Sequence, residues 1–314
     1  MIRVYLWRPP PEPSISNLQS KGLTGRDVWE HTGKMKETAI QLQKGKQRYA
    51  ALDTIRGLTL FSMILYHAIW DLVYVHGLDW AWYRSSWAYL WQQSICWCFI
   101  LLSGFCWSLG KHHLGRGVLT LGCGLLITEL TILFLWEDRV IFGILTFLGI
   151  AMLLMIPLDR LIAGVQRHMN AIIGNAVGLV CSLAVFVITR NVSRGSLGFE
   201  AWIFYQMPEE VYQGDLTAYL GFPGQGFYST DYFSLFPWFF LFLAGYFLYH
   251  LTKKNWQYTA EDSGLGTEQE KTIEKKSWLS IDIKPFSFLG RYSLLIYMLH
   301  QPVLFGLFML LFQS

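Results

Sequence analysis

The sequence predicts an all-α, polytopic transmembrane helical bundle of about seven spans, within a range of six to eight, and three observations support this prediction. Hydrophobic residues make up 53% of the 314 residues and charged residues only 15%, whereas a soluble domain carries about a quarter charged residues. The apolar residues gather in long blocks and do not alternate with polar ones. Lys and Arg are concentrated in every second loop between these blocks. The lipid bilayer is therefore the expected surrounding of this chain.

Seven blocks are long enough to be spans, because a helix needs about 20 apolar residues to cross a hydrocarbon core of roughly 30 Å. In chain order they are residues 57–75, 88–109, 117–136, 141–158, 171–189, 233–251 and 288–312. The fourth block is short, and the aromatic stretch 202–227 is ambiguous, which gives the range of six to eight spans.

The basic residues give the bundle a sidedness. Nine Lys and Arg lie within the first 50 residues, and more follow the second, fourth and sixth blocks. The opposite loops contain only Arg84, Arg139, Arg190 and Arg194. Because cytoplasmic loops carry the excess of Lys and Arg, we expect a cytoplasmic N-terminus and, with seven spans, a C-terminus outside. The predicted location is the cell membrane, as a multi-pass integral protein.

The remaining segments are polar. We expect residues 1–47 to form a poorly ordered cytoplasmic tail and residues 48–314 to form the transmembrane domain, with an extracytoplasmic loop at 191–231 and a charged cytoplasmic loop at 252–285. Translation from Met35 instead of Met1 stays an open alternative. The net charge of +3 is modest and gives no indication of nucleic acid, which is not expected as a partner.

The first span carries the most informative residues. Asp53 and Arg56 lie at its cytoplasmic edge, and His67 and Asp71 lie inside the apolar helix. At about 100° per residue these four side chains fall within roughly 60° of one another, on one stripe that faces the bundle. Ionisable residues at this depth are costly and mark a pathway or a site.

His67 and Asp71 are spaced i,i+4, so the carboxylate is expected to accept a hydrogen bond from one imidazole nitrogen and leave the other free as a general base. The alternative is a buried pair that only fixes helix packing. His76, in the first outer loop, is a second candidate base. Arg56 precedes His67 by eleven residues, roughly 16 Å along a helix, which is comparable to an extended pantetheine arm. A coenzyme A thioester could thus place its phosphates at Arg56, with Asp53 at the same donor end, and its acyl group at His67.

Five further residues are candidates. Glu129 interrupts the third block and is expected to face the bundle, since an unpaired Glu in lipid is costly. Asp231 stands among aromatic residues, a combination typical of sugar sites. Tyr297 and His300 share a helix face at i,i+3 spacing, and we expect them near the acceptor. Arg291 lies on the opposite face and is a candidate for the donor phosphates.

Cysteine gives no indication of a metal site. The sequence has no C-x-x-C pair of the kind that binds metals, and no metal cofactor is expected. All five cysteines lie inside apolar blocks, where a small buried side chain is the simplest interpretation: Cys96, Cys98, Cys106, Cys123 and Cys181.

The opening motif R-x-x-x-LD-x-x-RG-L, followed by Y-H-x-x-x-DL, runs from Arg48 to Leu72. It resembles the catalytic domain family of heparan-α-glucosaminide N-acetyltransferase, and in particular the compact bacterial branch of that family. Further similar stretches are residues 101–109, 142–154, 226–246 and 289–305. A related RG…H opening also occurs in the wider superfamily of integral-membrane acyltransferases.

The resemblance implies transfer of an acetyl group from cytoplasmic acetyl-CoA to an amino sugar or another saccharide across the membrane. It places His67 at the histidine of the wider superfamily. Similarity to the lysosomal enzyme of this family instead implies a catalytic histidine in the first non-cytoplasmic loop. His76 is the nearest counterpart there. The choice between the two histidines stays open at this point.

Two functions from other classes compete with this hypothesis. A proton-coupled transporter of a small polar solute would use the same intramembrane His, Asp and Glu as a relay. A non-enzymatic partner in envelope polysaccharide assembly would need none of them. The sequence also leaves open the acyl group, the acceptor, the choice between a ternary and an acyl-enzyme mechanism, and whether the chain forms a homo-oligomer.

Overall fold

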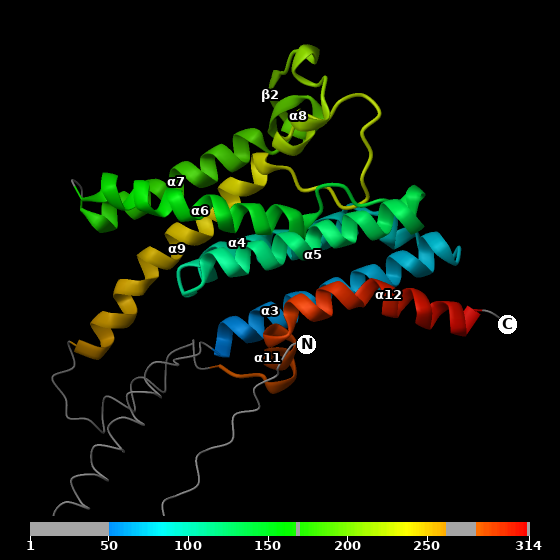
Figure 1. The fold of residues 1–314 in the computed structure, drawn as a ribbon, viewed down its shortest axis with the longest axis horizontal. Helices are drawn as coiled ribbons and strands as arrows, with labels where there is room; N and C mark the ends of the chain where they lie inside the picture. Colours follow the sequence, from blue (N-terminus) through cyan, green and yellow to red (C-terminus); the bar gives the residue numbers. More distant parts are fainter. Residues whose placement is uncertain (1–49, 168–169, 262–280, 313–314) are drawn as a thin grey trace, which may run out of the picture. The chain divides into compact units, whose positions relative to one another are not determined.

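The computed structural model describes residues 50–167, 170–261 and 281–312, and these residues belong to one compact unit. The expected tail at 1–47 and the central part of the expected cytoplasmic loop, residues 262–280, lie outside the described residues. Figure 1 shows the arrangement of the helices along the chain.

Seven of the described helices are long and apolar enough to cross a membrane, which confirms the predicted polytopic bundle and makes the chain an integral membrane protein. These helices are α3 (Ala50–Trp70), α4 (Ser86–Trp107), α5 (His113–Phe134), α6 (Ile144–Gln166), α7 (Ala171–Thr189), α9 (Leu235–Glu261) and α12 (Ser293–Phe312). A π-helical turn extends α3, the first of them.

The structure shifts several predicted boundaries; the first span, for example, begins at Ala50 and not at residue 57. The last span begins at Ser293, not at residue 288, because Lys284–Arg291 form a separate short helix, α11, with Pro285 in its first turn. Proline suits that position because its missing N–H would have no helical partner there. The fourth span is longer than predicted, since α6 continues through Pro157 to Gln166.

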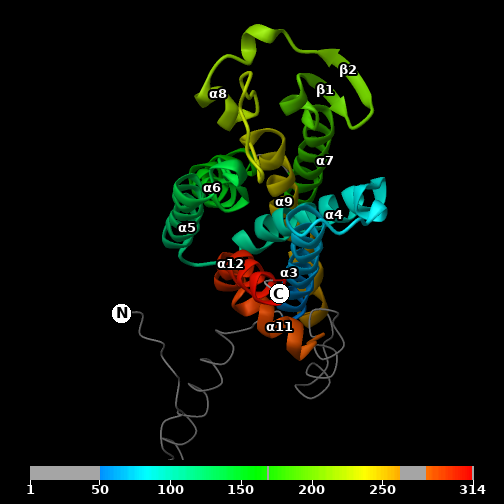
Figure 2. The same cartoon turned by 90° about the vertical axis from the view of Figure 1, so that its right-hand side faces the viewer.

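The ambiguous aromatic stretch does not form a span. It belongs to a cap made of an antiparallel hairpin, β1 (Ser196–Phe199) and β2 (Trp202–Gln206), and a short helix, α8 (Asp215–Leu220). The cap is called the outer cap below, after the side on which the basic residues predict it to lie. Figures 1 and 2 both place this cap at the end of α7. Short 3-10 turns complete the outer side: η2 (Ala81–Arg84), η3 (Trp136–Asp138), η4 (Val192–Arg194) and η5 (Glu209–Val211).

A charged network attaches the hairpin to the bundle. Glu200, in the hairpin turn, accepts a hydrogen bond from the Tyr89 hydroxyl at 2.9 Å and pairs with Arg190 at 3.3 Å. The buried guanidinium of Arg190 also donates to Gln93 at 2.7 Å and lies over the Trp238 ring at 4.9 Å. Because these partners come from α4, the end of α7, and α9, the hairpin of the cap is attached to three helices.

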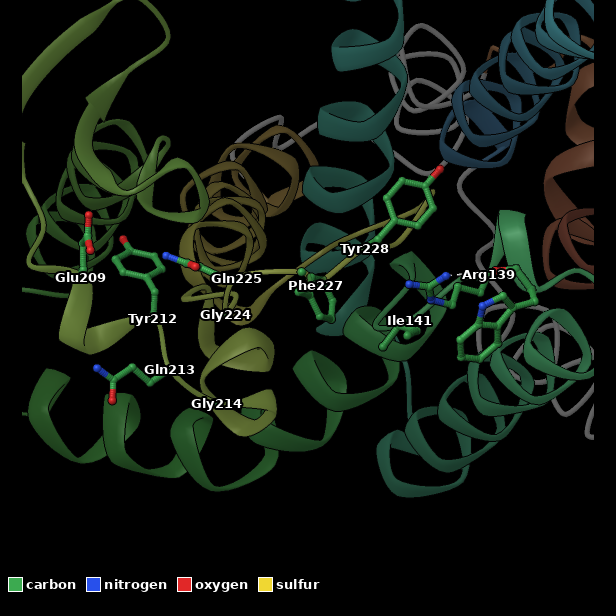
Figure 3. A pocket seen from close by; sticks show the side chains of 12 residues that line it. Arg139, Ile141, Glu209, Tyr212, Gln213, Gly214, Gly224, Gln225, Phe227 and Tyr228 are labelled. Carbon is green, nitrogen blue, oxygen red and sulfur yellow. Dashed lines mark hydrogen bonds between the residues drawn. The ribbon is translucent and has the colours of Figure 1, made fainter.

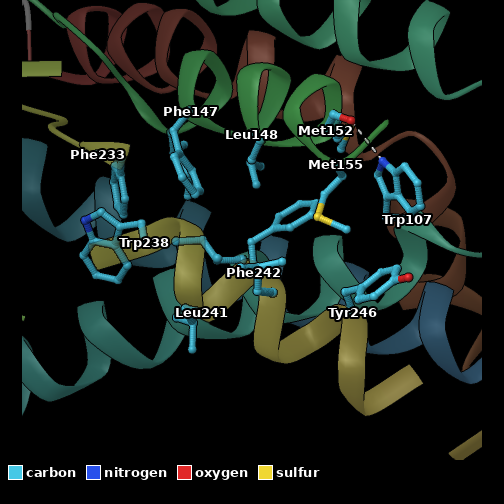
Figure 4. Close-up of a cluster of buried hydrophobic side chains, with 14 of the residues drawn as sticks. Trp107, Phe147, Leu148, Met152, Met155, Phe233, Trp238, Leu241, Phe242 and Tyr246 are labelled. Carbon is cyan, nitrogen blue, oxygen red and sulfur yellow. Dashed lines mark hydrogen bonds between the residues drawn. The ribbon is translucent and has the colours of Figure 1, made fainter. Parts of the chain in front are cut away.

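The core lies between α4, α6 and α9 (Figure 4). Phe147, Met155 and Phe242 are fully buried there, and Trp107 Nε1 donates to the backbone oxygen of Met152 at 3.0 Å. Helices α4 and α9 touch backbone to backbone, since a Cβ on Gly104 would lie 1.9 Å from a carbonyl oxygen of α9. Small residues at such crossings are the usual means of close helix packing in membranes.

Helices α3, α11 and α12 form a second group. Helix α11 packs along the N-terminal half of α3, and α12 lies beside α3 in both views (Figures 1 and 2). This group meets α4 through a small cluster of buried residues, Leu60, Met63 and Ile95. Its contacts place the predicted site residues of the first and last spans side by side.

Candidate active site

The N-terminal end of α3 is pressed against α11 at a pair of glycines. Because the basic residues predict this end to be cytoplasmic, it is called the cytoplasmic end below. A Cβ built on Gly57 would lie 1.8 Å from a carbonyl oxygen of α11, and one built on Gly290 would lie 1.9 Å from a carbonyl oxygen of α3. Only residues without a side chain permit this approach. As a consequence, the neighbouring residues Arg56 and Arg291 come to the same end of the site.

Asp53 lies between these two arginines. Its Oδ1 atom is 3.1 Å from Arg56 Nη1, and its Oδ2 atom is 4.0 Å from Arg291 Nε. The Asp53 side chain is only 14% exposed, whereas that of Arg291 is 42% exposed. The structure therefore brings together the three residues that the sequence predicted for the donor end.

Arg116, on α5, adds a third guanidinium. In the sequence it is one of the basic residues that follow the second apolar block, and it was not a predicted site residue. Its Nη1 atom would be 2.0 Å from a Cβ on Gly110, and it is close enough to Arg56 for their charges to interact. Arg56 Nη2 also donates to the Cys106 sulfur at 3.1 Å. In the described part of the chain, no carboxylate pairs with Arg116. This end of the bundle thus has a surplus of positive charge suited to an anion.

The imidazoles of His67 and His300 face each other further along α3. Their ring centroids are 5.0 Å apart, and both side chains are half-buried. Neither ring nitrogen of His67 has a hydrogen-bond partner among the described residues. The structure therefore pairs the predicted base from the first span with a residue that the sequence assigned to the acceptor side.

The hydrogen bonds of His300 determine its tautomer. His300 Nδ1 lies 2.6 Å from the backbone oxygen of Tyr297. A carbonyl oxygen can only accept, so Nδ1 carries the proton. In the neutral ring the lone pair is then on Nε2, which leaves this nitrogen able to accept a proton from a bound group.

The predicted hydrogen bond between His67 and Asp71 is wrong. Helix α3 changes at Asp71 into a π-helical turn, η1 (Asp71–Val75), whose His76 N–H bonds to the Asp71 carbonyl five residues back. The wider turn gives Asp71 a different direction from that of a regular α-helix. In the described residues its Oδ1 accepts from Gln301 Nε2 at 3.1 Å, and its buried Oδ2 has no partner.

His76 lies away from the histidine pair. Its ring stacks on Phe312 at 4.4 Å and meets Phe308 at 5.8 Å, near the end of α12. Phe312 is twelve residues beyond His300, roughly 18 Å along a helix. The two candidate bases of the sequence analysis are therefore at different depths, although His76 and Asp71 are close enough for their charges to interact.

Asp231 lies half-buried at the start of α6. Its Oδ2 atom accepts from the backbone N–H of Ile144 at 3.0 Å, which satisfies one of the free N–H groups of that helix end. Burial raises the pKa of the Asp231 carboxyl to about 6, although the Ile144 N–H acts in the other direction. Asp231 also interacts electrostatically with Tyr297 and Cys96. It thus joins the outer segment to the helices of the site.

Glu129 does not face the bundle as predicted. Its side chain is exposed on α5. The reason is the packing of α5 on α6, where a Cβ on Gly124 would lie 2.4 Å from the Thr146 nitrogen. Glu129 is five residues further on, about 140° around the helix from that contact. It therefore lies outside the candidate site.

The structure thus brings the predicted residues together in two groups. Asp53, Arg56 and Arg291 meet at the cytoplasmic end, and His67, His300, Tyr297 and Asp231 gather further out. Asp71 adjoins the second group through Gln301, which the sequence analysis missed although it directly follows His300. Among the described residues, no three His, Cys, Asp or Glu side chains are arranged to hold a metal ion.

Comparison with known families decides the affiliation of the chain. Residues 48–302 match the family model described as heparan-alpha-glucosaminide N-acetyltransferase, catalytic. The match covers both residue groups, from the start of α3 to the His300-Gln301-Pro302 sequence in α12. The chain belongs to the heparan-α-glucosaminide N-acetyltransferase catalytic family. The resemblance stated from the sequence motifs is thereby confirmed.

Membership in this family makes the chain a membrane-embedded member of an acetyltransferase family. No curated protein and no solved structure matches it. The roles of individual residues therefore depend on the geometry described above.

Proposed function

We propose that the protein transfers an acetyl group from cytoplasmic acetyl-CoA to the amine of an amino sugar, or to another saccharide, on the far side of the membrane. The observation that carries the proposal is the arrangement along α3. Three guanidinium groups lie at its cytoplasmic end, and the histidine pair lies eleven residues further on, roughly 16 Å along the helix. An extended pantetheine arm joins phosphates to a thioester over a comparable length.

The donor end supports binding of the phosphate groups. Arg56 and Arg291 share the single carboxylate of Asp53, and Arg116 has no carboxylate partner within the described ranges. Guanidinium groups form bidentate hydrogen bonds to phosphate oxygens. An entering phosphate would relieve the repulsion between Arg56 and Arg116, so the surplus charge favours an anionic ligand at this place.

The histidine pair supports the chemistry of the transfer. The amine nitrogen attacks the thioester carbonyl, a C–N bond forms, and the C–S bond breaks. One proton leaves the amine for an imidazole nitrogen, and one proton is delivered to the departing thiolate, so the products are the amide and free coenzyme A. An imidazole with a free lone pair can accept the first proton near neutral pH.

We assign the general base to the pair of His67 and His300 and not to His76. The two facing rings allow a proton to pass from one to the other, and the Tyr297 carbonyl fixes the tautomer of His300. His76 is stacked on the aromatic end of α12. Asp71 then holds the pair indirectly, because it orients Gln301, the neighbour of His300 in the chain.

The acceptor side is assigned to Asp231 and Tyr297. Asp231 comes from the outer segment and interacts with Tyr297, whose ring lies 5.2 Å from that of His300. An acceptor from outside would meet these residues before it reaches the histidine pair.

The decisive experiment uses the full chain purified in lipid nanodiscs with acetyl-CoA labelled in the acetyl group and glucosamine as acceptor. We expect labelled N-acetylglucosamine and one free thiol per acetyl group transferred. Proton-coupled solute uptake by proteoliposomes without any release of free coenzyme A would overturn the proposal in favour of a transporter. Labelled product with the wild type but equal rates for a His67→Ala, His300→Ala double variant would remove the histidine pair from the mechanism.

A further inference from the structure

A cavity of about 760 Å³ opens on the outer side of the protein, separate from the two groups of the candidate site (Figure 3). It lies between the loop that joins α5 to α6 and the segment 209–228 of the outer cap. Small-molecule sites commonly measure about 300–1,000 Å³. The volume exceeds what one sugar ring needs and suits a ligand of several rings.

One end of the cavity presents aromatic faces around a cation. The Arg139 guanidinium lies 4.6 Å from the Trp136 ring and 5.3 Å from the Tyr228 ring, and its Nη1 donates to the Trp136 backbone oxygen at 3.1 Å. Trp136 and Tyr228 are nevertheless 61% and 49% exposed. The cation therefore orients two aromatic faces that remain open to a ligand.

The other end presents polar groups without partners. Glu209, Gln213 and Gln225 line it and are exposed (Figure 3), and their side chains make no hydrogen bond within the described ranges. Amide side chains both donate and accept, and a carboxylate accepts. Such groups match the hydroxyl and amine groups of a sugar. The lining carries one Arg and one Glu, so its charge is balanced, which does not favour a polyanion.

The wall of the cavity is fixed before any ligand binds. The Thr230 N–H donates to the Arg139 backbone oxygen at 3.1 Å, and the Ile141 N–H donates to Ser229 Oγ at 2.9 Å. The rings of Phe142 and Phe227 stack at an angle of 16°. A preformed wall lowers the entropic cost of binding.

The same wall leads to the candidate active site. Tyr228 lines the cavity, and Asp231 follows three residues later, half-buried and hydrogen-bonded to the Ile144 N–H. A charge on Asp231 also acts on Tyr297. A ligand held in the cavity would thus lie on the segment that supplies the acceptor side of the site.

We infer that this cavity binds a saccharide of several residues, neutral or bearing amines, and that it holds the acceptor chain while one of its sugars is acetylated. The inference rests on the proposed function. Sugar rings place their C–H faces on aromatic rings, and Trp136 and Tyr228 offer such faces. The unpartnered groups of Glu209, Gln213 and Gln225 would bind the next sugars along the chain.

The test compares a short acceptor with a long one. In the transfer assay, Trp136→Ala is expected to raise KM for a β1–4-linked glucosamine tetramer about tenfold, the loss of one well-formed contact, with kcat unchanged. KM for glucosamine itself should stay the same, because one sugar reaches the histidine pair without filling the cavity. A Gln213→Ala, Gln225→Ala double variant should show the same pattern. Trp87→Ala, at another exposed Trp of the outer side, is the matched control and should change neither value.

Direct binding separates the cavity from the reaction. Titration calorimetry of the full chain with the tetramer should show binding that Trp136→Ala weakens and Trp87→Ala keeps, even if no acetyl transfer occurs. Tetramer binding without acetyl transfer would support the cavity as a saccharide site and contradict the proposed function. Transfer to glucosamine without tetramer binding by the wild type, or equal losses for both acceptors in Trp136→Ala, would overturn the inference. Weaker attachment of Trp136→Ala to lipid vesicles with unchanged tetramer binding would identify the aromatic group as a membrane anchor and also overturn it.

Discussion

Helices α6 and α9 and helices α3 and α12 belong to the same bundle but are packed in opposite ways. In their most apolar windows, 50% of the residues of α6 and 56% of those of α9 are buried, against 28% for α3 and none for α12. The first pair meets at apolar side chains of the core. The second pair meets at histidines, tyrosine and glutamine. The apolar core contacts thus lie on α6 and α9, and the polar side chains of the candidate site lie on α3 and α12.

The contrast between the two pairs indicates where a substrate could bind inside the bundle. A close-packed interior leaves no room for a substrate, and α6 and α9 have such an interior. The half-buried faces of α3 and α12 leave their polar side chains accessible, while their exposed apolar side chains suit contact with lipid. We therefore interpret α6 and α9 as the scaffold of the bundle, and we call α3 and α12 the working pair.

The largest effect is expected from His67, in the working pair. His67→Ala should lower the rate of acetyl transfer by about 10²–10⁴-fold, the usual contribution of a general base, and leave the melting temperature unchanged. His112→Ala, at an exposed histidine of the cytoplasmic side, is the control. If His67→Ala lowers the melting temperature strongly and the lost activity follows the lost folded protein, the histidine pair only packs two helices together.

Phe242 tests the scaffold in the opposite sense. Phe242→Ala should lower the free energy of unfolding by about 3–5 kcal/mol, because the buried ring leaves a cavity. Thermal unfolding in detergent measures the loss, and Leu133→Ala, at a side chain 70% exposed on α5, is the control. The fraction of Phe242→Ala that remains folded should have the same KM for acetyl-CoA as the wild type. A changed KM at full stability would contradict the division into scaffold and working pair.

Gly290 tests how the donor end is assembled. Gly290→Ala places a methyl group 1.9 Å from a carbonyl oxygen of α3, so α11 must move and take Arg291 away from Asp53. We expect KM for acetyl-CoA to rise more than tenfold, a cost of more than about 1.4 kcal/mol. Gly164→Ala is the control, since a Cβ there would meet nothing within 4 Å. An unchanged KM in Gly290→Ala would show that the arginines act independently of this contact.

Arg116 is expected to have a smaller effect of the same kind. Arg116→Ala should raise KM for acetyl-CoA about tenfold, the contribution of one charge-assisted contact, and leave KM for the acceptor unchanged. Arg160→Ala, at an exposed arginine near the end of α6, is the control. If both variants behave alike, the effect is one of general charge and not of a phosphate contact.

The spans could be predicted from the sequence because hydrophobicity is a local property. The same locality explains the error at the last span, where apolar residues continue across the break between α11 and α12 at Tyr292. The outer hairpin could not be predicted from the aromatic stretch alone. It depends on Glu200 reaching Tyr89 and Arg190, which are far away in the sequence.

The site could be predicted only in part. The stripe of Asp53, Arg56 and His67 followed from helical periodicity, because α3 is a regular helix from Ala50 to Trp70. The partner of Asp71 did not, since the π-helical turn changes the angle and Gln301 lies 230 residues further on. Arg116 was missed for a similar reason, as no local pattern shows that α5 brings it near Arg56.

The last prediction concerns Asp231, which joins the outer cap to the working pair. Its folded-state pKa of about 6 lies above the ordinary value of 3.8, so the folded protein binds the proton more tightly than the unfolded chain. The stability from this group is fully present below about pH 3.8 and is lost as the pH rises through about 6.

Asp231→Asn carries a neutral side chain at every pH and keeps an oxygen that can accept from Ile144. Its melting temperature relative to the wild type should therefore rise between pH 4 and pH 7, by an amount on the order of 1 kcal/mol in unfolding free energy. Differential scanning fluorimetry of both proteins across this range measures the effect. A constant difference would show that the carboxyl titrates normally and that the outer segment leaves it in contact with water. A rising difference would show that the Asp231 carboxyl is shielded from water, as expected of a residue that lines the proposed acceptor side.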